Sequence, residues 1–355
     1  MTGADLSLKQ VIDFDAGTRK YDLIITVSDG INTLAIEGTV NVGAVNEAAP
    51  VFVGAPYVVT FTETTAISTV IQTVVATDAD SADTSDGKVV YSFTIPNPQF
   101  NINANTGDVI LLTSLDYETA PSHVLNIQAS DGTNNVATTL TLTVGDVNDN
   151  TPIFSPMVYS ATISEGDPVN TNIATVTATD ADNGATINGQ IRFSIIGGTG
   201  DFTIDATTGA ITNTNTLDYE TATSHILSIR AVDRNGDASS KSSTAIVTVI
   251  VTSLNELDPV FSQTTYTFNT PENSALGTSV GQVVATDADA GDDGSVYYSM
   301  LANTYFFLNT ASGEINIKSA LDYDTLPNHS FEVVSYDRGT APQRSATATI
   351  NVVLT

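Results

Sequence analysis

Short segments in which apolar and polar residues alternate recur along the chain. Residues 136–144 and 243–251 are clear examples, rich in Val, Ile, Leu and Thr, and Gly, Asn, Asp and Pro lie between such segments. Alternation with a period of two is typical of a strand that buries one face. No segment keeps an apolar stripe at the 3.6-residue spacing of a helix. The pattern therefore predicts an all-β fold.

Four landmarks recur in the same order along the chain. Leu-Asp-Tyr begins at Leu115, Leu217 and Leu321, Asp-Ala-Asp at Asp78, Asp180 and Asp287, Pro-x-Phe at Pro50, Pro152 and Pro259, and a turn glycine lies at Gly107, Gly209 and Gly313. A repeat of about a hundred residues with about seven short strands is typical of a Greek-key sandwich. The sequence predicts tandem seven-stranded, immunoglobulin-like Greek-key sandwiches at residues 47–149, 150–256 and 257–355.

Residues 1–46 match only the C-terminal part of a repeat. Ile12-Asp13-Phe14 stands for Leu-Asp-Tyr, and Ser28-Asp29-Gly30 matches Ser130-Asp131-Gly132. About three of seven strands would be present. The sequence predicts a truncated sandwich whose apolar face, with Leu23, Ile25 and Val27, is uncovered.

Composition narrows the function classes. The chain has 355 residues, a net charge of −29 and 41% hydrophobic residues, which is too apolar for a disordered acidic tail. The charge argues against nucleic acid and anionic membranes as partners, because both are polyanions. Cysteine is absent, so disulfides and thiolate metal sites are excluded. No apolar run reaches eighteen residues, so a membrane anchor would have to lie outside this sequence.

The acids gather at recurring positions. Asp146-Val147-Asn148-Asp149-Asn150 crowds oxygen side chains into five residues just before Pro152. Residues i and i+2 of an extended chain point to the same side, so Asp180 and Asp182 form one carboxylate pair, and Asp218 and Glu220 another. Sites built only from oxygen suit Ca²⁺, which accepts six to eight ligands in loose geometry, better than Mg²⁺. The sequence predicts calcium at the joints between repeats.

These motifs together resemble extracellular cadherin repeats. The resemblance rests on Leu-Asp-x-Glu, Asp-x-Asn-Asp-Asn-x-Pro-x-Phe, Asp-Ala-Asp, a first-strand Glu and a late Ala-x-Asp. It implies a rod of sandwiches arranged end to end, with up to three Ca²⁺ ions at each junction. It also implies calcium-dependent cell–cell adhesion at the extracellular face of the plasma membrane, through homophilic or heterophilic contacts with other cadherin ectodomains. The chain has no Trp and no His-Ala-Val triplet, which favours internal repeats of a long, non-classical cadherin.

The resemblance implies a ligand set for each junction. At the middle junction it consists of Glu63, Asp116, Glu118, Asp146, Val147, Asn148, Asp149, Asn150, Asp180, Asp182, Asn188 and Asp233, with Val147, Asn150 and Asn188 acting through carbonyls. At the first junction it consists of Asp13, Asp15, Asn46, Glu47, Asp78, Asp80 and Asp131. At the third-repeat junction it consists of Glu165, Asp218, Glu220, Asn255, Glu256, Asp287, Asp289 and Asp337. Glu272, Asp322 and Asp324 would form a half site near the C-terminus.

The first and third-repeat junctions depart from the motif. Ala44 and Ser253 stand where the middle linker has Asp146, and Glu47 and Glu256 replace Asp149. Judged by the linkers alone, these two junctions should bind calcium more weakly, because ligand charge is a main determinant of calcium affinity.

Two other functions are alternatives to adhesion: an enzyme, and a spacer or binding module. His123, His225 and His329 occupy equivalent positions, which favours a structural role over a single catalytic histidine, and no nucleophile or phosphate-binding motif accompanies them. The chain is therefore predicted not to be an enzyme. A cadherin-like spacer or carbohydrate-binding module of a secreted microbial protein remains the alternative. Asn328-His329-Ser330 is a glycosylation sequon.

Overall fold

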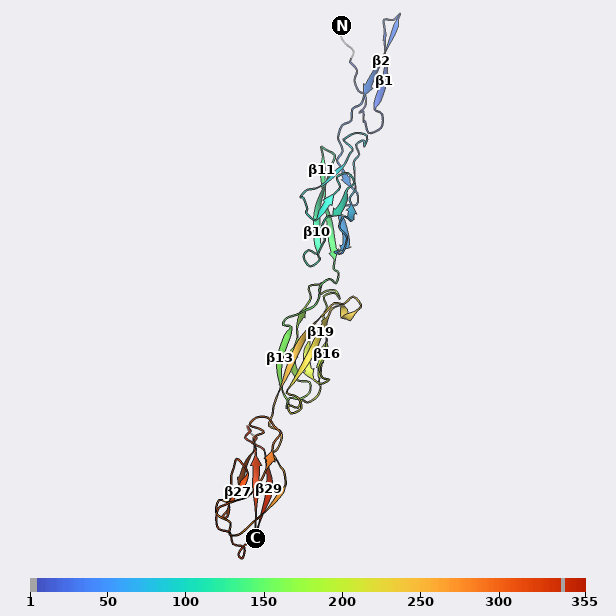
Figure 1. The fold of residues 1–355 in the computed structure, drawn as a ribbon. Helices are drawn as coiled ribbons and strands as arrows, with labels where there is room; N and C mark the ends of the chain where they lie inside the picture. Colours follow the sequence, from blue (N-terminus) through green and yellow to red (C-terminus); the bar gives the residue numbers. More distant parts are fainter. Residues whose placement is uncertain (1–4, 340–341) are drawn as a thin grey trace. The chain divides into compact units, whose positions relative to one another are not determined.

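The computed structural model describes residues 5–339 and 342–355, and these residues form β-strands, turns and one short 3-10 helix (Figure 1). Contacts divide the chain into two compact units. The first comprises residues 1–150 and 181–189, and the second comprises residues 151–180 and 190–355. The segment 181–189 therefore groups with the unit that precedes it, and each unit is described by itself.

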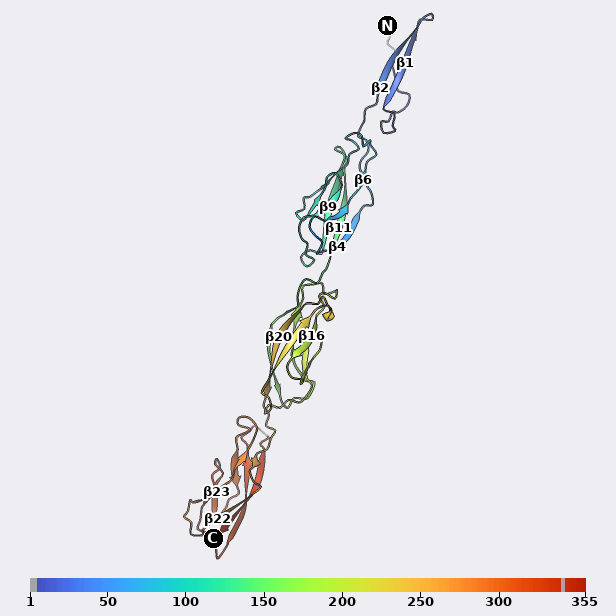
Figure 2. The same ribbon diagram turned by 45° about the vertical axis from the view of Figure 1, so that its right-hand side comes forward.

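The first complete repeat shows how the sandwich is built. Its strands are β3 (Val51–Phe52), β4 (Tyr57–Thr62), β5 (Val70–Thr73), β6 (Ala76–Thr77), β7 (Val90–Phe93), β8 (Phe100–Ile102), β9 (Asp108–Leu111), β10 (Ser122–Ser130) and β11 (Asn135–Gly145). One sheet has the order β4-β11-β10-β7, with β4 parallel to β11, and the other has the order β5-β9-β8. The short β3 pairs with β6. Counting β3 with β4 and β5 with β6 as interrupted strands gives seven, as predicted. Figure 2 labels β4, β6, β9 and β11 of this repeat.

The second and third repeats follow the same topology. The second contains β12 (Ile153–Phe154), β13 (Val158–Ser164), β14 (Asn172–Thr175), β15 (Ala178–Thr179), β16 (Arg192–Gly197), β17 (Phe202–Ile204), β18 (Ala210–Asn213), β19 (Ser224–Val232), the 3-10 helix η1 (Arg234–Gly236) and β20 (Ser242–Thr252). The third contains β21 (Val260–Phe261), β22 (Thr265–Thr270), β23 (Ser279–Gln282), β24 (Ala285–Thr286), β25 (Tyr297–Met300), β26 (Phe306–Leu308), β27 (Glu314–Ile317), β28 (Asn328–Tyr336) and β29 (Ser345–Leu354). The predicted all-β fold of tandem immunoglobulin-like sandwiches is confirmed.

Each repeat encloses its own apolar core. In the second repeat Leu227, Ile229, Val247 and Val249 are fully buried, and they alternate along β19 and β20 with residues on the outer face. The first and third repeats have cores built from the matching strands. The turn glycine is required locally: Gly107 has φ +73°, and a Cβ there would lie 2.2 Å from the carbonyl oxygen of Val74. The three cores explain why the alternation repeats so regularly in the sequence.

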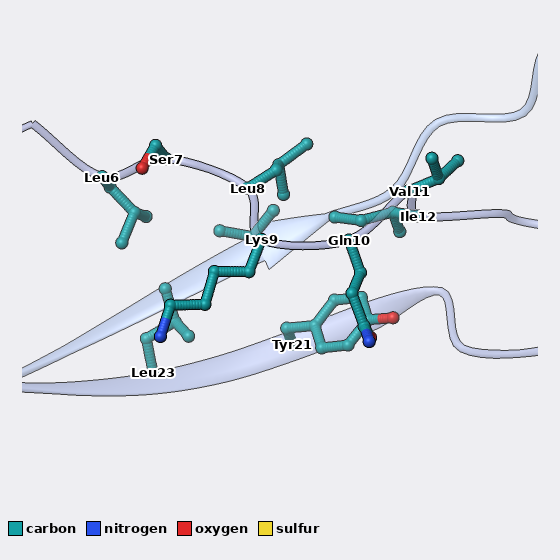
Figure 3. Close-up of a pocket in the computed structure, with 10 residues that line it drawn as sticks. Leu6, Ser7, Leu8, Lys9, Gln10, Val11, Ile12, Tyr21 and Leu23 are labelled. Atoms are coloured by element: carbon teal, nitrogen blue, oxygen red, sulfur yellow. The ribbon is translucent and has the colours of Figure 1, made fainter.

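Residues 5–46 contain one hairpin, β1 (Lys20–Ser28) paired with β2 (Thr33–Asn41). The sequence predicts about three strands here, and the described residues form two. Residues 5–7 align with part of β9, which in the next repeat pairs with both β5 and β8. Within the described part of the chain, residues 5–12 contain no strand. Figure 3 shows Leu6, Leu8 and Ile12 along the groove that faces Tyr21 and Leu23 of β1.

Candidate metal centres

In the first two complete repeats, a glutamate at the end of a long strand ties the following linker to the turn that carries Leu-Asp-Tyr. Glu63, only 6% exposed, accepts a hydrogen bond from the Tyr117 N–H at Oε2 and one from the Val147 N–H at Oε1, both at 2.7 Å. Glu165 bonds the N–H groups of Tyr219 and Leu254 in the same way. Because each carboxylate spans two separate segments, it fixes the linker against the acidic turn.

Segment 181–189 brings further polar groups to the middle linker. Thr186 Oγ1 and Asn188 Nδ2 each donate to Oδ2 of Asp146 at 2.9 Å. The N–H of Asn150 donates to Oδ1 of Asp182 at 3.2 Å, and Asn150 Nδ2 donates to the same oxygen at 2.9 Å. The linker and this segment therefore form one polar cluster within the first unit.

The carboxylates of this cluster lie close enough to share cations. Ligand atoms of Glu63, Glu118 and Asp149 lie within 4.8 Å of one another, and so do those of Glu118, Asp146 and Asp182. Burial raises the pKa of Glu118 to about 7, and the nearby Glu63, Asp116 and Asp149 add to the rise. Glu118 Oε1 and Asp146 Oδ1 are buried and accept no hydrogen bond from the described residues. Buried carboxylate oxygens without a donor are costly unless a cation pairs with them.

Other predicted ligands of the middle junction are placed as follows. Asp116 turns its oxygens toward Thr119: Oδ2 accepts from Thr119 Oγ1 at 2.6 Å, and this bond lowers the pKa of Asp116. Asn148 lies in the linker, half-buried. Asp180 and Asp233 belong to the second unit, where Asp233 is fully buried and its Oδ1 accepts the Lys241 N–H at 2.7 Å. Their role at the junction stays a prediction.

The third-repeat junction lies within the second unit and repeats much of this arrangement. Ligand atoms of Glu165, Asp218 and Glu220 lie within 4.8 Å of one another. Burial raises the pKa of Glu220, and Glu165 and Asp289 add to the rise. Burial likewise raises the pKa of Glu256, again with help from Glu165 and Asp289. These carboxylates repel one another across a short distance.

The linker of the third-repeat junction is anchored to the repeat that follows. Asn255 Nδ2 donates to Oδ2 of the buried Asp337 at 3.1 Å, and the Leu257 N–H donates to Oδ2 of Asp289 at 3.1 Å. Asp289 Oδ1 and Asp287 Oδ2 are buried and accept no hydrogen bond from the described residues. The structure thus gathers all eight predicted ligands around this linker and its neighbouring turns.

The first junction is more exposed. Ligand atoms of Asp13, Asp15 and Glu47 lie within 4.8 Å of one another, although all three residues are exposed or half-buried. Asp80 Oδ2 accepts the Ala48 N–H at 3.2 Å, and Asp78 Oδ2 is buried without a partner among the described residues.

The remaining predicted ligands of the first junction lie around Asn134. Although burial opposes it, hydrogen bonds from Asn134 and Thr133 lower the pKa of Asp131 to about 2. Asn134 Nδ2 also donates to Oδ1 of Asn46 at 2.7 Å. Near the C-terminus, Glu272 accepts a hydrogen bond from the Tyr323 N–H at 2.6 Å. Asp322 Oδ2 accepts one from Thr325 Oγ1, just as Asp116 Oδ2 accepts one from Thr119 Oγ1. Asp324 follows in the same turn.

The junctions also contain contacts that the motifs did not predict. Tyr117 accepts a hydrogen bond at its hydroxyl from Asn183 Nδ2, at 2.8 Å. At the first junction Arg19 instead bonds Ser81 and pairs with Asp83 at 3.1 Å. At the third-repeat junction Arg344 donates to the Asn255 carbonyl. Asn183, Arg19 and Arg344 differ from their counterparts in the other repeats, so a search for repeated landmarks passes over them.

The histidines and the sequon occupy strand positions. His123, His225 and His329 each pack edge-on against a core phenylalanine, with ring centroids 5.1–5.3 Å apart. This repeated packing agrees with a structural role. Asn328 begins β28 and is exposed, as is Ser330, while His329 between them points into the core.

The fold and these clusters define a class: tandem immunoglobulin-like sandwiches whose linkers meet carboxylates from the adjacent turns. A model of the cadherin domain matches residues 57–145, 159–252 and 266–355. The chain belongs to the cadherin family. No helix among the described residues is long and apolar enough to cross a membrane.

Relatives of this chain are much longer proteins that are named as protocadherins or cadherins. Human protocadherin Fat 1 is 35% identical over 343 residues, which are 94% of this chain and 7% of that protein. Mouse cadherin EGF LAG seven-pass G-type receptor 2 is 32% identical over 99% of this chain and 12% of that protein. The chain thus spans a small part of the relatives it matches.

Solved cadherin structures share the fold. Extracellular cadherin domains 1–5 of protocadherin gamma B2 superpose with a TM-score of 0.81 at 26% identity, covering 98% of this chain and 68% of that one. Domains EC22–24 of mouse cadherin-23 give a TM-score of 0.74 at 28% identity, covering 87% of this chain and 99% of that one.

Proposed function

We propose that this chain is part of a cell-adhesion ectodomain whose junctions are stiffened by calcium. The single observation that best supports the proposal is the set of buried carboxylate oxygens without hydrogen-bond donors around Glu118 and Asp146. Membership of the cadherin family adds support, because the relatives include protocadherins. Adhesion through other cadherin ectodomains, at the extracellular face of the plasma membrane, is part of the proposal. Glycosylation at the exposed Asn328 fits the same location.

The residues present fit a hard divalent cation. Around Glu118 the candidate ligands are carboxylates and amides, and calcium prefers oxygen ligands in flexible geometry. A bound calcium ion supplies positive charge that offsets the repulsion among these groups. The chain supplies the geometry: Glu63 holds the linker by two backbone hydrogen bonds, and Asn150 holds Asp182. When the ion neutralises these carboxylates, their mutual repulsion no longer opposes an ordered linker.

Thermal and urea unfolding of the full chain, with calcium and with a chelator, tests the proposal. Extracellular calcium modules bind at roughly 10⁻⁴–10⁻³ M. At free calcium of about ten times Kd, each occupied site should add about 1.4 kcal/mol to the free energy of unfolding. Magnesium at the same concentration serves as the ionic-strength control. Identical unfolding curves in calcium and in chelator would overturn the proposal.

A further inference from the structure

The loop after each Asp-Ala-Asp ends in a glycine that packs under the second aspartate. A Cβ at Gly189 would lie 2.3 Å from the carbonyl oxygen of Asp182, and one at Gly87 would lie 2.4 Å from that of Asp80. At Gly294 the matching distance, to the carbonyl of Asp289, is 1.9 Å. These close approaches identify the three glycines as structurally equivalent, although the third loop is shorter. The residue before each glycine is therefore also equivalent.

Backbone contacts support the equivalence in the two longer loops. The N–H of Asn188 donates to Oγ1 of Thr186 at 3.2 Å, and the N–H of Asp86 donates to Oγ1 of Thr84 at 3.3 Å. Both threonine hydroxyls also lie within hydrogen-bond distance of a carbonyl three residues earlier, and the single hydroxyl proton of Thr186 is shared between that carbonyl and Asp146. Asn188 and Asp86 thus occupy the same place in the same turn.

In the middle junction this loop position touches the first linker position. Asn188 Nδ2 lies 2.9 Å from Oδ2 of Asp146. The linker residue is Asp146 where the loop residue is Asn188, but Ser253 where the loop residue is Asp293, and Ala44 where it is Asp86. In all three junctions one of the two positions is an aspartate and the other is uncharged. The aspartate lies in the linker at the middle junction and in the loop at the other two, so each junction has one aspartate at this pair of positions.

The third-repeat junction shows where the carboxylate of Asp293 lies. A Cβ at Gly339 would lie 2.5 Å from Oδ1 of Asp293 and 2.2 Å from Nδ2 of Asn255, so both side chains reach the same spot beside the linker. Asp289 is 6% exposed and Asn255 is 9% exposed, and each has a buried side-chain oxygen with no hydrogen-bond donor among the described residues. Asp293 lies close enough to Asp289 for the two carboxylates to repel each other. A half-buried carboxylate next to two buried acceptor oxygens is the arrangement that a cation would stabilise.

We propose that Asp293 and Asp86 replace the missing linker aspartate as calcium-binding residues at their junctions. The proposal rests on the calcium function argued above and adds ligands to it. It also changes an expectation drawn from the linkers alone: Ser253 and Ala44 do not leave these junctions short of a carboxylate. The third-repeat junction should then bind calcium about as tightly as the middle one.

A swap of the two side chains tests the proposal in the full chain. Asp146→Ser should weaken calcium binding at the middle junction about tenfold, since ligand charge tunes affinity. Adding Asn188→Asp to that variant recreates the Ser253 and Asp293 pair and should recover most of the loss. Asp293→Asn should weaken binding at the third-repeat junction, and Asp292→Asn, a change of the exposed neighbour, should not. Titration calorimetry measures the number of ions and their affinities, and circular dichroism in chelator confirms that each variant folds.

The outcomes separate the two proposals. A chain that binds no calcium at all would overturn the proposed function. If the natural chain binds calcium but Asn188→Asp does not rescue Asp146→Ser, the calcium function stands and the exchange of carboxylates is wrong. Equal effects of Asp293→Asn and Asp292→Asn would also overturn the exchange, because they would reduce it to net charge. Rescue in the middle junction together with selective loss at Asp293 would support it.

Discussion

Replacing Glu63 by alanine should loosen the middle linker even when calcium is absent. The side chain is 6% exposed, and its two oxygens accept the N–H groups of Tyr117 and Val147. Alanine leaves both donors without this acceptor. It also removes one source of repulsion acting on Glu118, whose pKa is raised to about 7 by burial first and by Glu63 second. The two effects have opposite signs.

Their magnitudes decide the outcome. Hydrogen bonds to charged groups contribute about 1.5–3 kcal/mol each, so losing both should cost about 3–6 kcal/mol locally. Water that reaches the new space recovers part of this, which leaves a net cost of about 2–4 kcal/mol. Relief of repulsion on Glu118 is smaller, because burial rather than Glu63 is the main cause of its raised pKa. We therefore expect destabilisation.

Hydrogen exchange of the full chain in chelator measures the effect at the right amides. In Glu63→Ala, the amides of Tyr117 and Val147 should exchange at least tenfold faster, while β19 and β20 of the second repeat should not change. Glu272→Ala is the matched control, since Glu272 is exposed and accepts the N–H of Tyr323 at a water-accessible place. Unchanged exchange at Tyr117 and Val147 would refute the structural role assigned to Glu63.

Three further outcomes are expected. Burial lowers the pKa of His329, so below pH about 6.5 the unfolded chain binds more protons than the folded chain, and the stability of the third repeat should decrease as the pH is lowered. In urea unfolding, His329→Leu should reduce this pH dependence, and an unchanged dependence would contradict the assignment. Tyr117→Phe removes the acceptor of Asn183 Nδ2 and should speed exchange of segment 181–189 in chelator; Tyr219→Phe, whose counterpart of Asn183 is Ala290, is the control, and equal effects would disprove a specific bond. Asn328→Gln should abolish the mass lost on treatment with peptide N-glycosidase after secretion from animal cells, whereas a loss that persists would place the glycan elsewhere.

The sequence predicts the fold well because the strands alternate with a strict period and the landmarks repeat. Val247 and Val249 are buried in the segment 243–251, where the pattern predicts a strand, and the turn glycines lie where only glycine fits. The candidate ligands at the third-repeat junction gather for the same reason, since each lies at a fixed place in the repeat. Asp86 and Asp293 are not among the ligands predicted from the sequence, because the role proposed for them depends on contact between a loop and a linker far apart in the sequence. The structure reveals that contact through the hydrogen bond from Asn188 Nδ2 to Oδ2 of Asp146.

Segment 181–189 has a mechanical consequence. The chain passes from the first compact unit to the second after residue 150, returns at residue 181 and leaves again after residue 189. No single cut of the backbone can therefore separate the two units cleanly. We therefore expect that pulling on the chain also strains the hydrogen bonds from Thr186 and Asn188 to Asp146, which hold this segment to the linker. Segment 181–189 belongs to the second repeat in sequence, but its hydrogen bonds to Asp146 connect it to the linker that follows the first complete repeat.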